Sequence, residues 1–297
     1  WKETAEAFHT TWDHVFCSVE MAVKWGKENR DLADIKAIGV DEIQWQRGHK
    51  YLTLVYQIDS DCRRLLWVGQ NRTIKTLLRF FMWFGKQRSE QLEHVCSDMW
   101  KPYLKVIKKK AVNALHILDR FHIMAYLSKG IDKVRAEEVR SLKDKGLEPV
   151  LTQSRWLLLK KPENLNERQE SKLSELLQCN LKTIRSYLLK EEFQQFWQYA
   201  SPYWAEQFLD KWCTKTMRSK IEPMKKVAKM LRRHKPLLMN WFKAKGQFSS
   251  GIVEGFNNKA KLTTRKAYGF RTYYAAEIAL FHTLGALPVP ETAHRFS

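Results

Sequence analysis

Short apolar runs rich in β-branched residues dominate the first 120 residues, and they are flanked by runs with helical spacing. Residues 1–30 carry apolar side chains near helical spacing, which predicts a helical segment. Three β-rich runs follow, separated by Gly48 and Asp61, and they predict an antiparallel three-stranded meander. Helix and strand signals then alternate, which predicts parallel pairing with right-handed crossovers in one mixed α/β sheet. The predicted strands are Ile35–Asp41, Tyr51–Ile58, Arg64–Val68, Glu93–Ser97 and Ala114–Leu118, and the predicted helices between them are Thr73–Gln87 and Lys101–Lys108.

The strand signals end near Phe121, and charged helical patterns fill the chain as far as Lys245. Two apolar stripes in this stretch predict the core of an all-helical region, because aromatic and aliphatic stripes at helical spacing are usually buried. The last stretch, Gly251–Gly285, predicts two more helices broken near Tyr268, Gly269 and Phe270. The stripes are Leu173, Leu176, Leu177, Leu181, Ile184, Leu188 and Leu189, and then Phe193, Phe196, Trp197, Trp204, Phe208 and Trp212.

The composition describes a folded and strongly basic chain. Of its 297 residues 44% are hydrophobic, and no apolar run approaches the roughly 18 residues that span a bilayer. The net charge is +20, and from residue 201 on there are 18 Lys and Arg against 6 Asp and Glu. This balance favours nucleic acid as a partner, with an acidic protein or a membrane surface as alternatives.

The cysteine pattern argues against a zinc ribbon in this stretch, because no two cysteines form a C-x-x-C pair. Their odd number and wide spacing predict reduced thiols in a cytoplasmic protein. The five are Cys17, Cys62, Cys96, Cys179 and Cys213.

Three carboxylates are the strongest chemical signal. Asp41 and Asp98 each end an apolar run, and Glu254 lies near the start of a basic helix. Alone, each aspartate suits a turn or a helix cap, and Glu254 suits the first turn of a helix. Together they suit a two-metal site for phosphodiester chemistry, because functional groups gather at the carboxyl ends of strands and hard cations prefer carboxylate oxygens.

Six ordered motifs carry a specific resemblance over residues 30–285. The chain resembles bacterial insertion-sequence transposases of the DDE type, in the IS-L-three group. This resemblance implies a ribonuclease-H-like mixed five-stranded sheet with a large all-helical insertion before the third acidic residue. The motifs are Ile38-Gly39-Val40-Asp41-Glu42, Tyr51-Leu52-Thr53, Asp98-Met99, Leu118-Asp119-Arg120-Phe121-His122, Val253-Glu254-Gly255-Phe256-Asn257-Asn258-Lys259 and Ala267-Tyr268-Gly269-Phe270-Arg271.

By this resemblance, Asp41, Asp98 and Glu254 would be catalytic and would hold two divalent ions, Mg²⁺ with Mn²⁺ as the alternative. Both DNA strand cleavage and strand transfer would use this site. Asp119 is expected either to cap the following helix or to support the site, and His122 either to contact phosphate or to pack.

A basic track is expected beside these carboxylates. Glu254, Asn258, Lys261 and Arg265 are four, three and four residues apart, so they share one helical face. Such a face is either a solvated surface or a path for DNA phosphates leading to the metal ions. The residues expected to contact DNA are Arg72, Lys75, Asn258, Lys259, Lys261, Arg265, Lys266 and Arg271.

We therefore expect five segments, with the final catalytic helices carrying Glu254. The resemblance also implies an N-terminal zinc-binding segment and a helix-turn-helix, of which residues 1–30 resemble only the end. Expected partners are the DNA of the transposon ends and target, a possible second copy on DNA, and no membrane, in the bacterial cytoplasm at the nucleoid. Alternatives to an active transposase are a ribonuclease-H-like nuclease and an inactive DNA-binding relic. The segments are 1–30 (helical remnant of a DNA-binding region), 31–122 (first part of the catalytic domain), 123–246 (helical insertion), 247–287 (final catalytic helices) and 288–297 (tail).

Overall fold

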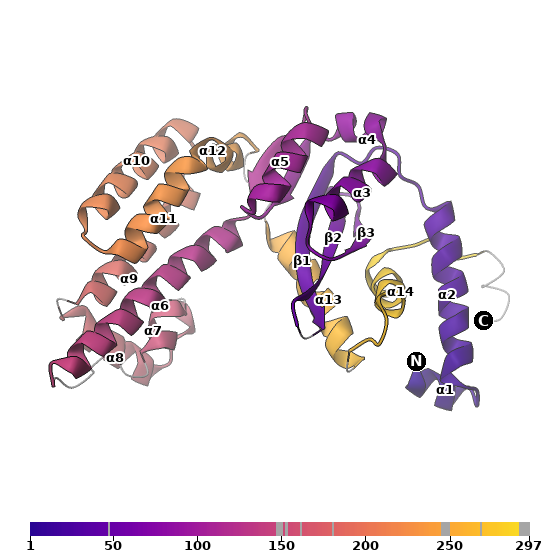
Figure 1. Cartoon of the computed structure of the whole chain (residues 1–297), viewed down its shortest axis with the longest axis horizontal. Coiled ribbons are helices and arrows are strands. Elements are labelled where there is room, and N and C mark those ends of the chain that lie inside the picture. Colours follow the sequence, from indigo (N-terminus) through magenta and orange to yellow (C-terminus); the bar gives the residue numbers. More distant parts are fainter. Residues whose placement is uncertain are drawn as a thin grey trace. The chain divides into compact units, whose positions relative to one another are not determined.

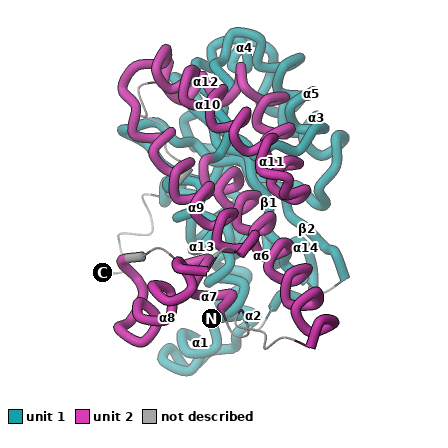
Figure 2. The backbone as a smooth tube through the Cα atoms, turned by 90° about the vertical axis from the view of Figure 1, so that its left-hand side faces the viewer, with its two compact units in different colours: residues 1–119, 248–297 teal, residues 120–247 magenta. Residues whose placement is uncertain are grey.

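The structure, a computed structural model, describes residues 1–46, 48–146, 151, 154–160, 162–179, 181–244, 250–267 and 269–290. The chain forms two compact units, which Figure 2 shows in different colours. The first unit combines Trp1–Asp119 with Phe248–Ser297, and the second is Arg120–Gln247. None of the described helices is both long and apolar enough to cross a lipid bilayer. All five cysteines are free, as predicted.

A five-stranded mixed sheet forms the centre of the first unit (Figure 1). Its strand order is β3-β2-β1-β4-β5, in which β1 and β3 run antiparallel to β2, while β1, β4 and β5 run parallel. An antiparallel meander thus continues into parallel strands, which confirms the predicted ribonuclease-H-like mixed sheet. The strands are β1 (Ala37–Gln46), β2 (Lys50–Ile58), β3 (Arg63–Gln70), β4 (His94–Ser97) and β5 (Leu115–Leu118).

Two predicted boundaries were wrong, each for a local reason. β1 does not end at Asp41, because it continues along β2 as far as Gln46. Only Ala37–Val40 pairs with β4, so Asp41 is the first residue of β1 beyond that partner. The single helix predicted to run to Gln87 is two helices, because Gly85 adopts a φ of 87° and ends the first of them.

Helices cover both faces of the sheet. Residues of α3 and α5, among them Phe80 and Tyr103, form a buried cluster with Val40 of β1. The neighbouring Gly39 faces the opposite way, toward Val253 of α13, because side chains alternate along a strand. The helices of this unit are α1 (Lys2–Ala7), α2 (Trp12–Asn29), α3 (Ile74–Phe84), α4 (Lys86–Gln91), α5 (Lys101–Lys110), α13 (Ser250–Lys266) and α14 (Tyr273–Leu284).

The N-terminal helices belong to this unit. α2 packs on α14, where the Lys27 ammonium lies 2.7 Å from the Glu277 carboxylate. The helical prediction for residues 1–30 is confirmed, with a break between α1 and α2. Their origin in a DNA-binding region stays a prediction.

Every described element of the second unit is a helix, and the sheet takes no strand from it, as predicted. Most residues of the two apolar stripes are buried. Burial was wrongly predicted for Leu177, Leu188 and Trp204, which are exposed because each stripe is divided between separate helices. The helices are α6 (Arg120–Asp144), α7 (Arg155–Leu159), η1 (Pro162–Asn164), α8 (Glu167–Leu177), α9 (Lys182–Gln194), η2 (Gln195–Gln198), α10 (Pro202–Arg218), α11 (Glu222–Arg233) and α12 (Lys235–Lys243).

Candidate catalytic site

Three aspartates follow one another across three neighbouring strands. Val40 of β1 pairs with Ser97 of β4, and Ser97 pairs with Leu118 of β5. The next residue of each chain segment is an aspartate: Asp41, Asp98 and Asp119. The register therefore places their backbones in one row, at the edge where the parallel pairing ends. All three are at least nine-tenths buried.

The Asp41 carboxylate is held by the last long helix of the first unit. The Asn257 amide of α13 donates a hydrogen bond to Asp41 Oδ2, and the Tyr56 hydroxyl of β2 donates to Asn257 Oδ1 at 2.9 Å. Burial, with a smaller contribution from the charge of Asp41, raises the pKa of Tyr56 well above its usual range. Tyr56 therefore stays a protonated donor. The other oxygen of Asp41 accepts from the Glu42 backbone N–H at 2.7 Å.

The Asp98 carboxylate is held differently. Its Oδ2 lies 2.8 Å from the Arg72 guanidinium, and its Oδ1 accepts from the backbone N–H of Trp100 at 3.0 Å. The same guanidinium lies 2.8 Å from the Glu42 carboxylate and 4.5 Å from the centre of the Trp100 ring. Arg72, which the sequence predicts as a DNA contact, thus joins two carboxylates and stacks on an aromatic ring.

A buried polar pair supports the backbone beside Asp98. The Ser97 hydroxyl donates to the Asp98 carbonyl at 2.9 Å and lies 2.8 Å from His116 Nε2. Burial lowers the pKa of His116 to about 4, so its imidazole is neutral near pH 7. This pair could not be predicted from the sequence, because neither residue follows a spacing typical of a site.

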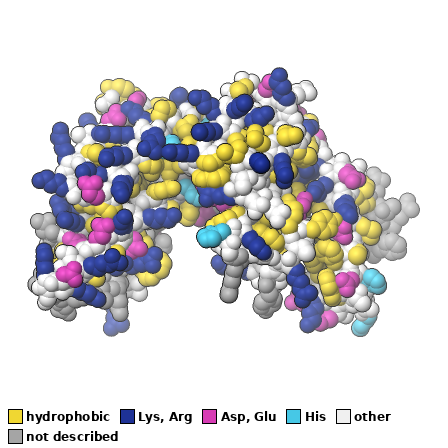
Figure 3. Space-filling model, viewed as in Figure 1, with side chains coloured by type: hydrophobic (Ala, Val, Ile, Leu, Met, Phe, Trp, Pro, Cys, Tyr) yellow, Lys and Arg dark blue, Asp and Glu magenta, His cyan; other side chains and the backbone are white. Residues whose placement is uncertain are grey.

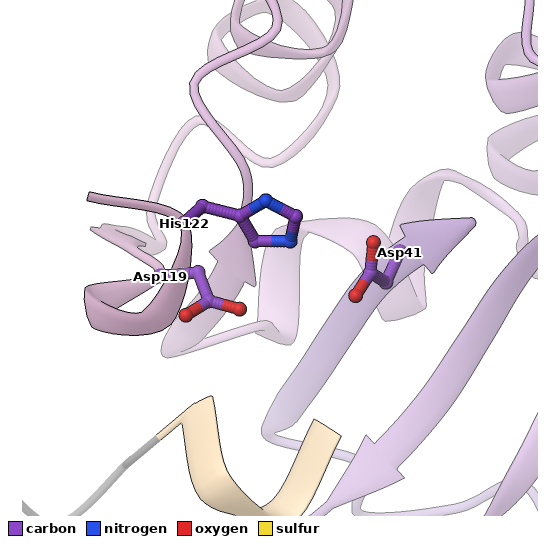
Figure 4. Close-up of side chains that lie close together, drawn as sticks. All are labelled: Asp41, Asp119 and His122. Atoms are coloured by element: carbon purple, nitrogen blue, oxygen red, sulfur yellow. The ribbon is translucent and has the colours of Figure 1, made fainter. Parts of the chain in front are cut away.

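Asp119 lies beside Asp41, in addition to its place immediately before α6. Asp41 and Asp119 each offer a carboxylate oxygen within 4.8 Å of the other. Figure 4 shows the Asp41 and Asp119 side chains, which come from β1 and from the residue after β5. In the part of the chain that the structure describes, Asp98 and Glu254 are not members of this group. His122, in the first turn of α6, belongs to the second unit.

Glu254 lies near the start of α13, the helix that Asn257 joins to Asp41. Its side chain is partly buried, and it has no hydrogen bond or ion pair with another described residue. The predicted shared face is confirmed, because α13 is continuous and Asn258, Lys261 and Arg265 are exposed along it. The convergence of Glu254 with Asp41 and Asp98 stays a prediction.

The remaining residues singled out from the sequence separate into exposed and packed groups. Trp45 is buried in the core, and His49 lies in the β1–β2 hairpin. Lys259 lines a cavity beside α14, so it lies on a different face of α13 from Glu254. The other basic residues predicted to contact DNA are exposed: Lys75, Lys261, Arg265, Lys266 and Arg271.

Comparison with known proteins agrees with this arrangement. A family model described as a transposase, of the DDE type and the IS-L-three group, matches residues 38–278. The chain is 30% identical over 269 residues to the transposase for insertion sequence element IS1001 of Bordetella parapertussis, covering 90% of this chain and 65% of that protein. It is also 30% identical over 263 residues to the transposase for insertion sequence element IS1557 of Mycobacterium tuberculosis, covering 81% of this chain and 58% of that protein.

The chain spans less than two thirds of the length of these relatives. The matched region includes the five-stranded sheet from the second residue of β1 on, the helical unit and α13. With its aspartate row on β1, β4 and β5 and its glutamate on α13, the chain belongs to the family of DDE transposases of the IS-L-three group.

Proposed function

We propose that the first unit carries the DNA-cutting centre of an insertion-sequence transposase, which performs strand cleavage and strand transfer in turn. One observation supports this most strongly: Asn257 joins the helix that carries Glu254 to Asp41, which is one of three aspartates in a row across β1, β4 and β5. Its DNA substrates would be the transposon ends and the target, and binding them would place the protein at the nucleoid.

The residues present fit divalent ions. Asp41 and Asp119 offer buried carboxylate oxygens close together, and oxygen ligands are what Mg²⁺ and Mn²⁺ prefer. Asp41, Asp98 and Glu254 would hold the ions, with Asp119 beside them. Two such ions, when bound, would activate a water molecule or a DNA 3′-hydroxyl as the nucleophile and would stabilise the leaving oxygen.

The surrounding side chains keep these carboxylates oriented. Arg72 and the Trp100 N–H hold both oxygens of Asp98, and Asn257 holds Asp41. Lys261 and Arg265 lie on the face of α13 that carries Glu254, so they would bind the phosphates that flank the scissile bond.

The test is nicking of a supercoiled plasmid with Mg²⁺. Asp41→Asn, Asp98→Asn and Glu254→Gln should each reduce nicking below detection, because each removes a charged oxygen ligand. DNA affinity should persist or rise slightly, since one negative charge is lost. Asp13→Asn on the exposed side of α2 is the matched control and should nick normally.

If the Asp41→Asn variant still nicked plasmid DNA, the DNA-cutting site would not include Asp41. A second assay separates the alternative functions, because it joins a labelled 3′-hydroxyl end to target DNA. Cleavage without joining would indicate a nuclease, and DNA binding without either reaction would indicate a relic.

A further inference from the structure

A long and strongly basic segment of the chain lies outside the candidate catalytic site. Between Lys211 and Lys243 there are eleven Lys and Arg and a single acidic residue, Glu222. This segment begins in the second half of α10 and includes α11 and α12 of the second unit. α11 buries one side, including Met224 and Leu231, so its basic side chains are on the outer side. Figure 3 shows Lys and Arg side chains gathered over these helices.

A groove between α9 and α10 collects part of this charge. It has a volume of about 780 Å³. Its four cationic lining residues are Arg185 of α9 and Lys211, Lys215 and Arg218 of α10. The Arg232 guanidinium of α11 donates a hydrogen bond to the Thr214 hydroxyl at the groove wall, at 3.1 Å. Arg232 is therefore a fifth cation near the groove.

The acidic residues of the groove are already neutralised. The Glu192 carboxylate lies 2.7 Å from the Lys215 ammonium, and the Asp210 carboxylate lies 2.7 Å from the Lys235 ammonium. Arg185, Lys211 and Arg218 are exposed and form no ion pair with any other described residue. Their charges repel one another, and an anion in the groove would relieve this repulsion.

The spacing of the cations favours an extended polyanion over a single phosphate. Lys211 and Arg218 lie seven residues apart on one face of α10, which is about 10 Å at 1.5 Å per residue, and Arg185 lies on the facing helix. Leu188, half exposed on the opposite wall, offers an apolar surface to a sugar ring. A sugar–phosphate backbone has both the repeated charge and the less polar sugars.

We propose that the α9–α10 groove binds the sugar–phosphate backbone of DNA, as a second contact region in addition to the basic face of α13. The choice of DNA over an acidic protein rests on the proposed function. Contacts of this kind position the DNA and do not read its sequence.

The test measures binding of the full chain to a labelled random-sequence DNA duplex across a salt series, in EDTA so that no cleavage occurs. Arg185→Ala, Lys211→Ala and Arg218→Ala should each flatten the slope of log affinity against log salt by about 0.9, and the triple variant by about 2.7. At 0.1 M salt, each lost contact should weaken binding by roughly five- to tenfold.

The matched control replaces three exposed cations of α6 in the same unit, as Lys133→Ala, Arg140→Ala and Lys143→Ala together. It loses the same charge and should keep the wild-type slope. If both triple variants flattened the slope equally, the effect would be general electrostatic attraction to the whole chain, and the proposal would be overturned. A wild-type slope in the groove variant would overturn it as well. Thermal unfolding of both triple variants excludes misfolding as a cause.

Poly-L-glutamate as a competitor tests the acidic-protein alternative. Loss of poly-glutamate binding in the groove variant, with unchanged DNA binding, would overturn the DNA assignment. At limiting protein concentration the groove variant should nick plasmid more slowly than the wild type, because its affinity for DNA is lower. Absence of nicking in every chain, wild type included, would refute the proposed function and leave the binding result intact.

Discussion

At the scale of single residues, Asn257 has an unusual position. It is buried, and its amide contacts Asp41 of β1 on one side and Tyr56 of β2 on the other. A neutral amide suits this position because it donates to a carboxylate and accepts from a hydroxyl at once. We infer that Asn257 orients Asp41 and fixes α13, and with it Glu254, on the sheet.

Asn257→Asp should reduce nicking about 10- to 100-fold and weaken the apparent Mg²⁺ affinity, because a second carboxylate replaces the donor to Asp41. A Mg²⁺ titration of the nicking rate measures both quantities. Asn113→Asp, exposed in the turn before β5, is the control. An unchanged Mg²⁺ titration in Asn257→Asp would contradict the positioning role.

Arg72 offers a second residue-scale test, because its two roles predict different measurements. If it holds Asp98, Arg72→Ala should lower the nicking rate at saturating DNA about 10- to 100-fold and leave the salt slope of DNA binding unchanged. If it contacts phosphate, the slope should fall by about 0.9. We expect the first result, since two carboxylates occupy the guanidinium. Arg72→Lys should recover little, because an ammonium lacks the planar fork.

At the scale of elements, α13 approaches β1 most closely at Gly39. A methyl group on Gly39 would overlap the side chain of Val253. Gly39→Ala should therefore destabilise the protein by about 1–3 kcal/mol, since the helix must shift or the core must strain. Urea unfolding measures the loss.

The double variant Gly39→Ala with Val253→Ala serves as the control for this contact. It should recover part of the stability, because the smaller side chain makes room for the methyl group. Equal stabilities of Gly39→Ala and the wild type would show that the approach of α13 is not tight.

The elements were largely predictable, but the contacts between them were not. Period-two and helical patterns identified all five strands, because these patterns report which side of each element is buried. The end of β1 was missed, since its partner changes from β4 to β2 at Asp41 and no local residue marks the change. Asp119 and Asn257 resembled a cap and a polar helix residue. The role of Asp119 arises only from strand register, and that of Asn257 only from helix docking, which joins it to residues more than two hundred positions away.

At the scale of the whole molecule, charge should control DNA affinity. With a net charge of +20, the chain should bind duplex DNA with little sequence preference and a steep salt dependence. Lys261→Ala and Arg265→Ala on α13 should each flatten the slope by about 0.9. Anisotropy titrations between low and physiological salt measure this.

Lys86→Ala on the exposed surface of α4 is the control for these two variants and should keep the wild-type slope. Unchanged slopes in both α13 variants would show that the face beside Glu254 is only a solvated surface.

Because the first unit is made of two chain segments, its parts are synthesised at different times. The ribosome completes β5 and then synthesises the whole second unit before α13 emerges. At about 5–20 residues per second, this takes on the order of ten seconds. During that interval the nascent chain contains Asp41, Asp98 and Asp119 but neither Asn257 nor Glu254. Under the proposed function, a message truncated within the second unit would therefore yield a sheet that lacks Glu254 and cannot cut DNA, and cutting would require that α13 has been made.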